Sequence, residues 1–224
     1  MGKNIAIILA AGSGTRFGAG RPKQFLMLGG RTILEHSIAA FEQSTLIGRI
    51  VVVTREDCIE EVRRLAAPFA KVTDVIAGGR ERYESSINAL AVCTEDDDYL
   101  LFHDAVRPYL SELLIERLIN AGKGRHCVAA ALPATDTIVR ADAEGHLVET
   151  LRRSELWAMQ TPQCFPRNII AEAYRLCMDD PDFFPTDDCG VVMRYMPHVP
   201  ITLIEGESTN VKITYRSDLK EAQI

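Results

Sequence analysis

Short runs of apolar residues, many of them β-branched, alternate with segments of helical periodicity along most of the chain. The apolar runs are residues 5–9, 49–53, 72–76, 99–102 and 127–132. Between them, Leu34, Ile38 and Phe41 share one helix face, and residues 111–121 repeat the pattern with Ser111 placed to cap the first turn. Strands that alternate with helices predict an α/β fold, with a mainly parallel sheet covered by helices on both faces. Ligands of such sheets bind beyond the carboxyl ends of the strands, so the loops there are the candidate site.

The alternation stops after Pro133. Residues 135–140 and 146–151 predict two strands around a turn at 141–145, which together form a hairpin arm at about residues 135–156. Helical periodicity returns at residues 168–177, and two short strands at 201–204 and 210–214 precede a final helix from Ser217. The chain contains no repeat, low-complexity tract or linker, so we expect a single domain over residues 1–224 with a projecting arm.

The charge balance excludes several classes of partner. The 224 residues include 25 basic and 31 acidic side chains, a formal charge of −6, so no global field attracts nucleic acid or an anionic membrane. No apolar stretch reaches the length of about 18 residues that a membrane span requires. The N-terminus lacks the apolar region of a signal peptide, and the six cysteines form no CxxC pair or zinc-like cluster. We therefore expect a cytoplasmic protein with buried, reduced thiols.

The loop after the first strand contains two glycines and two cations at short spacing. Gly12 and Gly14 allow main-chain N–H groups to approach a phosphate, and Arg16 and Lys23 follow. The loop is neither GxGxxG, because residue 17 is Phe, nor a P-loop, because no GK[ST] follows. Two cations beside such a loop suit a triphosphate whose charge shifts during reaction. The alternative is a tight turn with solvated cations.

Two further loops follow later strands. Residues 78–85 contain two glycines and open a helix, so their N–H groups could meet an anion or a base edge; the alternative is a simple glycine turn with a helix cap. Asp104 ends a strand near Arg107, a pairing that suits Mg²⁺ and phosphate, or else an ion pair that closes the loop. We expect His103 to be packed or hydrogen-bonded rather than a general base.

Taken together, the motifs resemble one family of enzymes. LAAGSGTR, RPKQ, GGRERYESS, HDAVRP, DT, RSELW, TPQ, TDD and NVKIT occur in this order over about residues 5–219. The chain resembles the 2-C-methyl-D-erythritol 4-phosphate cytidylyltransferases, and also their sister group, which makes CDP-ribitol from ribitol 5-phosphate. The resemblance implies a Rossmann-like nucleotidyltransferase fold, Mg²⁺ as cofactor, CTP and a small polyol phosphate as substrates, and a homodimer in which the arm contacts the neighbouring site.

The resemblance also implies roles for single residues. Arg16, Lys23, Asp104 and Lys212 would be catalytic, with Mg²⁺ on Asp104. The nucleotide would contact Ala10, Ala11, Gly12, Gly14, Gly79, Arg82 and Ser85. The acceptor would contact Arg107, Thr137, Arg153, Thr161 and Thr186, and Thr137 and Arg153 would serve the neighbouring subunit's site.

Some positions depart from the methylerythritol pattern. Val106 and the TDDCGVV segment are closer to the ribitol group, Trp157 is closer to the methylerythritol group, and Arg80 and Arg152 stand where acidic residues often occur. The resemblance therefore implies CMP transfer from CTP to methylerythritol phosphate, with ribitol 5-phosphate as the alternative acceptor. A non-catalytic nucleotide-binding regulator is the alternative of another class. A phosphate monoester is largely dianionic at neutral pH, so the attack on CTP needs no side-chain base.

Overall fold

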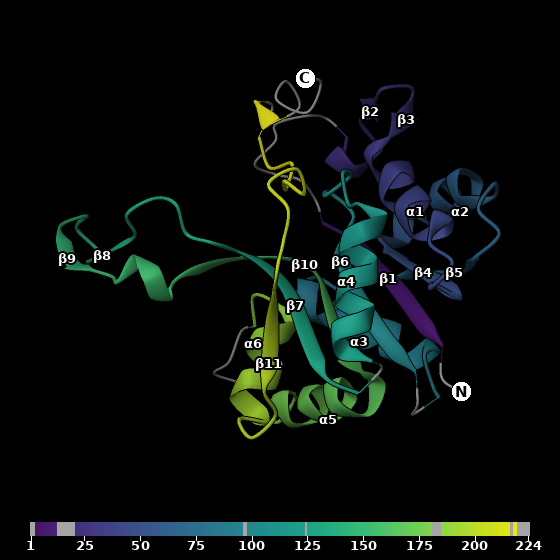
Figure 1. The fold of residues 1–224 in the computed structure, drawn as a ribbon. Helices are drawn as coiled ribbons and strands as arrows, with labels where there is room; N and C mark the ends of the chain where they lie inside the picture. Colours follow the sequence, from purple (N-terminus) through teal and green to yellow (C-terminus); the bar gives the residue numbers. More distant parts are fainter. Residues whose placement is uncertain are drawn as a thin grey trace.

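The computed structural model describes residues 3–12, 21–95, 98–123, 125–180, 185–215 and 217–218. A seven-stranded sheet forms its centre, in the order β11-β7-β10-β6-β1-β4-β5 (Figure 1). Neighbouring strands run parallel, except that β10 is antiparallel to both β6 and β7. The strands are β1 (Asn4–Ala10), β4 (Arg49–Thr54), β5 (Val72–Ala77), β6 (Tyr99–Asp104), β7 (Cys127–Pro133), β10 (Trp157–Pro166) and β11 (Ile201–Glu205). This arrangement confirms the α/β fold that the sequence predicts.

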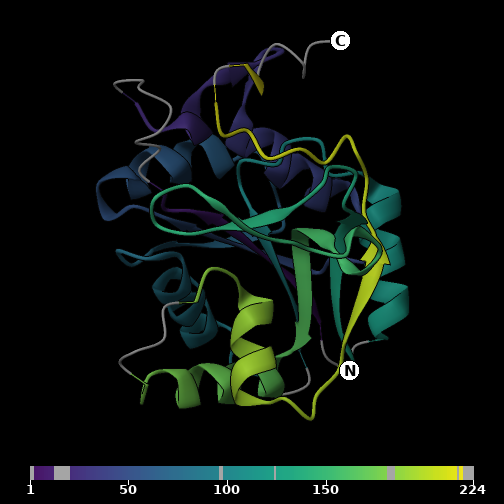
Figure 2. The same ribbon diagram turned by 90° about the vertical axis from the view of Figure 1, so that its left-hand side faces the viewer.

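Six α-helices of the described residues cover the two faces of this sheet (Figure 2). They are α1 (Ile33–Gln43), α2 (Ile59–Ala66), α3 (Arg82–Val92), α4 (Glu112–Gly122), α5 (Arg167–Cys177) and α6 (Asp188–Tyr195). Helices α1, α2 and α4 pack on one face, and α3, α5 and α6 on the other. None of the described helices combines the length and the apolar character that crossing a membrane would demand.

Strand residues alternate between the two hydrophobic cores because successive side chains point to opposite faces. Within β1, Ala6 and Ile8 belong to the core under α1, α2 and α4, whereas Ile5 and Ile7 belong to the core under α3, α5 and α6. All four side chains are fully buried. Double-sided burial explains why these strands appear in the sequence as continuous apolar runs.

Side chains cap the first turns of α1 and α4. The Ser111 hydroxyl accepts a hydrogen bond from the Leu114 N–H at 3.0 Å and caps α4, as expected. At α1, Thr32 and Glu35 form a capping box, in which each side chain satisfies the other's main-chain N–H. Both helices therefore begin after a residue whose side chain accepts a hydrogen bond from a main-chain N–H of the first turn.

The arm leaves the body of the molecule between β7 and β10 and projects far from it (Figure 1). Its two strands, β8 (Val139–Ala141) and β9 (Leu147–Thr150), pair only with each other within the described residues, and every residue in them is exposed. The 3-10 helix η4 (Arg153–Glu155) follows. The hairpin confirms the predicted arm, although its strands are shorter than residues 135–140 and 146–151.

The sequence analysis missed β10 as a strand. Pro162 lies within it, and proline usually excludes a central strand because it cannot donate a ladder hydrogen bond. The pairing of β10 with β7 shifts register between Met159 and Gln163, and this irregularity accommodates Pro162. The Thr161–Pro162 peptide bond is cis. The central sheet therefore contains one antiparallel strand that the sequence pattern did not reveal.

The prediction of a strand at residues 210–214 is wrong. This segment is irregular, and it crosses the carboxyl ends of the central strands instead of joining the sheet. Asn210 is fully buried and its amide donates to the Thr161 carbonyl at 2.8 Å, while the Ile213 N–H donates to the Val106 carbonyl at 2.9 Å. The rest of the helix predicted from Ser217 lies outside the described residues.

Two small elements near the first loop complete the described fold. The 3-10 helix η2 (Lys23–Phe25) leads into a two-stranded sheet of β2 (Met27–Leu28) and β3 (Arg31–Thr32). A further 3-10 helix, η3 (Glu56–Cys58), precedes α2.

All six cysteines are free, and five of them are buried, as expected for reduced thiols.

Candidate active site

A cavity of about 450 Å³ lies beyond the carboxyl ends of β1 and β6, at the start of α3. Most of the residues proposed from the sequence line it together: Ala10, Ala11, Gly12, Lys23, Gly79, Arg82, Ser85, Asp104, Thr186 and Lys212. A cavity of similar size between α2 and β5 is lined by Arg63, Phe69 and Asp74 among others, but no glycine-rich loop borders it. The chemistry of the lining, rather than the volume, identifies the first cavity as the candidate site.

Gln24 holds the first loop in shape, a role that sequence reasoning missed. Its side chain is buried, and its amide donates to the carbonyls of Ala10 at 2.6 Å and Gly12 at 3.2 Å. Both carbonyl oxygens of the loop therefore have a hydrogen-bond donor from within the chain. Gln24 follows Lys23 directly in the RPKQ motif, which is the only signal that the sequence offered. Gly14 and Arg16 lie outside the described residues.

Lys23 connects the first loop to the C-terminal segment. It begins η2, lines the cavity, and donates through Nζ to the Ile213 carbonyl at 2.8 Å. A primary ammonium carries three donors. The contact with Ile213 therefore ties the lysine to the C-terminal segment at the wall of the cavity.

The second loop approaches the first so closely that Gly78 is required. A Cβ on Gly78 would lie 2.6 Å from both the Ala11 Cβ and the Ser85 Oγ. The Gly79 N–H donates to Ser85 Oγ at 3.2 Å, and the N–H groups of Arg80 and Glu81 donate to Glu84 Oε2 at 2.5 Å and 2.9 Å. These three donors are used within the loop, so the expected contact of its N–H groups with an anion is not available in this conformation.

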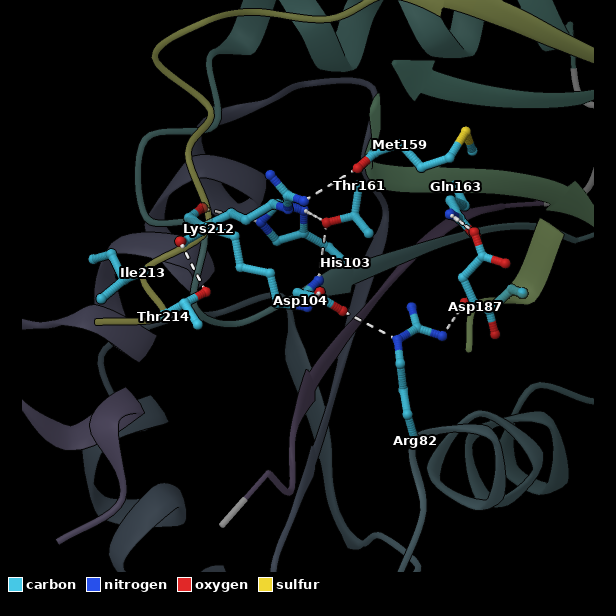
Figure 3. A network of polar contacts seen from close by, with 12 residues as sticks. Arg82, His103, Asp104, Met159, Thr161, Gln163, Asp187, Lys212, Ile213 and Thr214 are labelled. Carbon is cyan, nitrogen blue, oxygen red and sulfur yellow. Dashed lines mark hydrogen bonds and ion pairs between the residues drawn. The ribbon is translucent and has the colours of Figure 1, made fainter. Parts of the chain in front are cut away.

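Asp104 lies at the centre of the charged groups, with 8% of its surface exposed. Its Oδ1 accepts from Arg82 Nε at 3.2 Å, and its Oδ2 accepts from Lys212 Nζ at 2.7 Å (Figure 3). Burial alone would raise the pKa of this carboxyl, but the charges of Arg82 and Lys212 outweigh burial and hold the pKa below its ordinary value. Asp104 is therefore ionised at neutral pH.

His103 is a neutral, packed residue, as expected. It is fully buried, and its ring meets that of Phe41 edge-on at 5.3 Å between centroids. Its Nε2 lies 3.1 Å from the Arg107 carbonyl, which can only accept, so Nε2 carries the proton and Nδ1 accepts from the Thr161 hydroxyl at 3.0 Å. Burial lowers the pKa of His103 to about 4. The ring cannot serve as a general base in the cavity.

Thr161 and Arg107 support the site from behind instead of lining it. The Thr161 hydroxyl accepts the Asp104 N–H at 3.1 Å and is buried. The Arg107 guanidinium is also buried, and it donates to the carbonyls of Asn210 at 2.7 Å and Met159 at 3.4 Å. The side chains of Arg107 and Asp104 form no ion pair among those found in the described residues. In the described residues both side chains therefore lie behind the cavity lining, and their assignment as acceptor contacts stays a prediction.

Thr137 and Arg153 are not brought to the cavity of their own chain. Both are exposed on the arm, and the Arg153 guanidinium donates only to the nearby Thr135 carbonyl at 3.1 Å among the bonds of the described residues. Thr186, by contrast, is exposed at the rim of the cavity. The five expected acceptor contacts therefore fall into three places: the rim, the buried support and the distant arm.

The lining fits a magnesium ion only if the substrate supplies most of its ligands. The described residues contain no group of three or more His, Cys, Asp or Glu side chains that could hold a metal. Asp104 offers one carboxylate to a metal. Each of its oxygens accepts one hydrogen bond from a cation and has a second lone pair for a further contact. Mg²⁺ commonly binds through one or two carboxylates together with substrate phosphates. Asp104 matches that mode.

Comparison with known proteins supports the same chemistry. The family model described as IspD, 2-C-methyl-D-erythritol 4-phosphate cytidylyltransferase, matches residues 4–224. A protein of that name from Syntrophus aciditrophicus is 37% identical over 220 residues, which cover 97% of this chain and 93% of the relative. A bifunctional ribulose 5-phosphate reductase/CDP-ribitol pyrophosphorylase of Haemophilus influenzae is 34% identical over 222 residues, which cover 97% of this chain and 47% of that protein.

A solved structure agrees over nearly the whole chain. The crystal structure of 4-diphosphocytidyl-2C-methyl-D-erythritol synthase from Anaerococcus prevotii matches with a TM-score of 0.87 and 26% identity. The match covers 99% of this chain and 95% of that one. The likeness therefore includes the arm and the C-terminal segment as well as the sheet.

Proposed function

Because the chain belongs to the 2-C-methyl-D-erythritol 4-phosphate cytidylyltransferase family, we propose that it transfers CMP from CTP to 2-C-methyl-D-erythritol 4-phosphate and releases pyrophosphate. The observation that carries this proposal is that Arg82 and Lys212 both contact the Asp104 carboxylate in a cavity that Lys23 also lines. Such a set neutralises and orients two anionic substrates, which is what joining two phosphates requires.

In the proposed reaction, an oxygen of the acceptor's phosphate attacks the α-phosphorus of CTP. The new bond joins that oxygen to the α-phosphorus, and the bond to the bridging oxygen of the β-phosphate breaks, so pyrophosphate leaves with the electron pair. The attacking phosphate is already largely dianionic at neutral pH. The neutral, buried His103 agrees with a mechanism that takes no proton from the nucleophile.

The cations divide the work according to their positions. Lys23, beside the first loop, would hold the CTP phosphates together with Arg16, and Lys212 would hold the acceptor phosphate near Asp104. A magnesium ion would be held by Asp104 and the CTP phosphates, and when bound it would neutralise charge on the reacting phosphates. Fixed charges of this kind stabilise the transition state without reorganising during the reaction.

The direct test is pyrophosphate release from CTP and Mg²⁺ with two acceptors in parallel. We expect turnover with 2-C-methyl-D-erythritol 4-phosphate and little with D-ribitol 5-phosphate, and little with UTP in place of CTP. Turnover with ribitol phosphate alone would move the chain to CDP-ribitol synthesis. Calorimetric binding of CTP without turnover of either acceptor would contradict an enzymatic role and favour a regulator.

We also propose that the active unit is a homodimer joined through the arm. The arm exposes several large apolar side chains that its own chain does not cover: Ile138, Val139, Leu147 and Val148. Exposed apolar clusters of this kind mark interaction surfaces. Thr137 and Arg153 are exposed beside them and absent from the cavity of their own chain, which supports their use in a neighbour's site.

Mixing two inactive variants tests this exchange of parts. Arg153→Ala damages only the arm, and Lys23→Ala damages only the cavity. If a site combines one chain's cavity with the other's arm, each mixed dimer contains one intact site. Random exchange then restores roughly one quarter of wild-type activity. Restoration of none, with exchange verified by differential labelling, would show that each arm serves its own chain.

The setting that we propose is the cytoplasm. Nucleoside triphosphates are available there, and glutathione and thioredoxin keep thiols reduced. The six unpaired cysteines agree with that environment.

A further inference from the structure

A buried acidic side chain outside the cavity lining, Asp188, holds the arginine that touches Asp104. Asp188 Oδ2 accepts from Arg82 Nη1 at 2.7 Å, and its Oδ1 accepts from the Tyr174 hydroxyl at 2.6 Å. Arg82 in turn donates through Nε to Asp104 Oδ1 at 3.2 Å (Figure 3). A continuous polar path therefore runs from α5 through α6 and α3 to the carboxylate at the end of β6.

The outer members of this path are sealed from solvent. Asp188 is 0% exposed and Tyr174 is 2% exposed. A carboxylate in such a place is tolerated only when it is paired and hydrogen-bonded, and Asp188 has both kinds of partner. Nothing in the apolar core between α5 and α6 requires a charge there, so the charge of Asp188 is directed at Arg82.

Arg82 is shared between two carboxylates, and the stronger contact is the one farther from the cavity. Its bond to Asp188 is 2.7 Å, against 3.2 Å to Asp104. Its Nη2 is buried and has no hydrogen-bond partner within the described part of the chain. An arginine released from Asp188 could use Nε and Nη2 together as a two-pronged donor to Asp104, which is the favoured arginine–carboxylate geometry.

Among the four ion-paired side chains at this place, the charges balance only when Asp188 is counted; the charge of the buried Arg107 also acts on Asp104. Arg82 and Lys212 contribute two positive charges, and Asp104 and Asp188 contribute two negative ones. Without Asp188, Asp104 alone would face both cations, and the cluster would carry one excess positive charge. Asp104 would then be less available to a metal or to the reacting groups.

We propose that Asp188, oriented by Tyr174, is a positioning residue that holds Arg82 back from Asp104 and keeps that carboxylate available for the reaction. The inference rests on the proposed cytidyl transfer, since it names how one residue of that site is kept in its working state. It assigns a role to the second aspartate of the TDD motif, whose threonine, Thr186, lies on the cavity rim.

The test is Asp188→Asn, which keeps the shape of the side chain and removes its charge. We expect kcat to fall about tenfold or more, as happens when an outer partner of a catalytic ligand is removed. The dissociation constant of CTP, measured by calorimetry without Mg²⁺ or acceptor, should stay the same or become lower, because the cluster gains positive charge. A purely structural defect would instead weaken CTP binding together with kcat.

Asp187→Asn is the matched control. It removes the same charge from the adjacent residue, whose carboxylate caps α6 and accepts from Gln163 at 2.8 Å but does not contact Arg82. We expect it to leave kcat within about twofold of wild type. If Asp187→Asn lowers kcat as much as Asp188→Asn does, or if Asp188→Asn leaves kcat unchanged, the proposal is wrong.

Tyr174→Phe provides a second test that keeps both charges and the packed ring. Loss of one hydrogen bond to Asp188 should lower kcat by roughly threefold without changing CTP affinity. An unchanged kcat would overturn the proposal even if Asp188→Asn failed to fold. Failure of the proposed function is distinguishable, because it would appear as absent turnover in the wild-type chain.

Discussion

The cavity and the arm hold cations in opposite ways. In the cavity, Arg82 and Lys212 come from distant parts of the chain and converge on one buried carboxylate. On the arm, Arg140 pairs with Glu149 across a short hairpin, with 64% and 51% of the two side chains exposed. The first arrangement is held by the fold of one chain, whereas the second depends on sequence neighbours in water.

This difference shows which part of the site one chain can organise alone. In the cavity, Asp104 and Arg82 are largely shielded from water, so they act strongly on each other and fix each other's positions. Charges on the arm are screened by solvent and orient little by themselves. An arm residue that takes part in catalysis therefore needs a second surface to hold it, which in the proposed homodimer is the neighbouring chain.

The largest expected effect is on stability, from Asp104→Asn. The change leaves Arg82 and Lys212 without their shared carboxylate, and breaking a buried pair in this way costs about 3–5 kcal/mol. Urea unfolding at about pH 7 measures the difference from wild type. A loss below about 1 kcal/mol would mean that the cavity charges resemble those of the arm.

Wild type and Asp104→Asn also allow a test of how the free energy of unfolding changes with pH. The pKa of Asp104 is lower in the folded state, so its stabilisation is complete above the unfolded pKa of about 3.9 and is lost as the pH falls through the folded value. The stability gap between wild type and Asp104→Asn should therefore narrow by about 1 kcal/mol between about pH 5 and pH 3. A constant gap would contradict the lowered pKa.

Next in size is the loss of activity in Lys23→Ala. Removing one preorganised charge donor should lower kcat roughly 10²-fold or more, equivalent to about 2.7 kcal/mol of transition-state stabilisation. Steady-state pyrophosphate release measures it, and Arg64→Ala, an exposed cation on α2 far from the cavity, is the control. Near wild-type turnover in Lys23→Ala would remove this lysine from the mechanism.

The arm should show a smaller effect, on association. Leu147 is 66% exposed, and if it is buried between two chains, Leu147→Asp should weaken the dimer by about 2 kcal/mol, or roughly 30-fold. Sedimentation velocity over a range of concentrations measures this. Leu113→Asp makes the same change at a leucine of α4 that is 60% exposed on the body, and it should leave association unaltered. Equal behaviour of the two variants would argue against an arm-mediated dimer.

The smallest effect is expected from Arg140→Ala. Exposed ion pairs contribute little, so the free energy of unfolding should change by less than about 0.5 kcal/mol. Chemical denaturation of Arg140→Ala and Asp104→Asn under the same conditions compares the free energies that the arm and cavity charges contribute to folding. A change of more than about 1 kcal/mol would show that the arm is packed against something that shields its charges.

Much of the fold could be predicted from local sequence. Continuous apolar runs predicted β1, β4, β6 and β7 because burial on both faces leaves no polar position in a strand. Ser111 predicted the start of α4 because its hydroxyl acts on an N–H only three residues away. The antiparallel β10 was not predicted, since its pairing with β6 and β7 overrides the local signal of Pro162. The irregular C-terminal segment was not predicted either, since contacts with Thr161 and Val106 hold residues 210–214 outside the sheet.

The candidate site also contains some residues that the sequence could indicate and others that only the structure revealed. Gly12, Gly79, Lys23 and Asp104 could be singled out from the sequence because each follows a strand in a loop of suitable residue types, and all four line the cavity. The supporting roles of Gln24, Thr161, Arg107 and Asp188 were not, because each depends on a partner that only folding brings near. Arg107, for example, donates to Asn210, 103 residues away.

The sequence by itself determined the alternating architecture, the loops that carry chemistry and the arm, because these depend on residue type and on neighbours a few positions apart. Only the tertiary structure decided which charges meet. Asp104 reaches Arg82 across 22 residues and Lys212 across 108, through a strand order that places β6 beside β1 and β10 and through a C-terminal segment that crosses the strand ends. Electrostatic pairing depends on distance in space and on the exclusion of water, and neither is written in the local pattern of a chain.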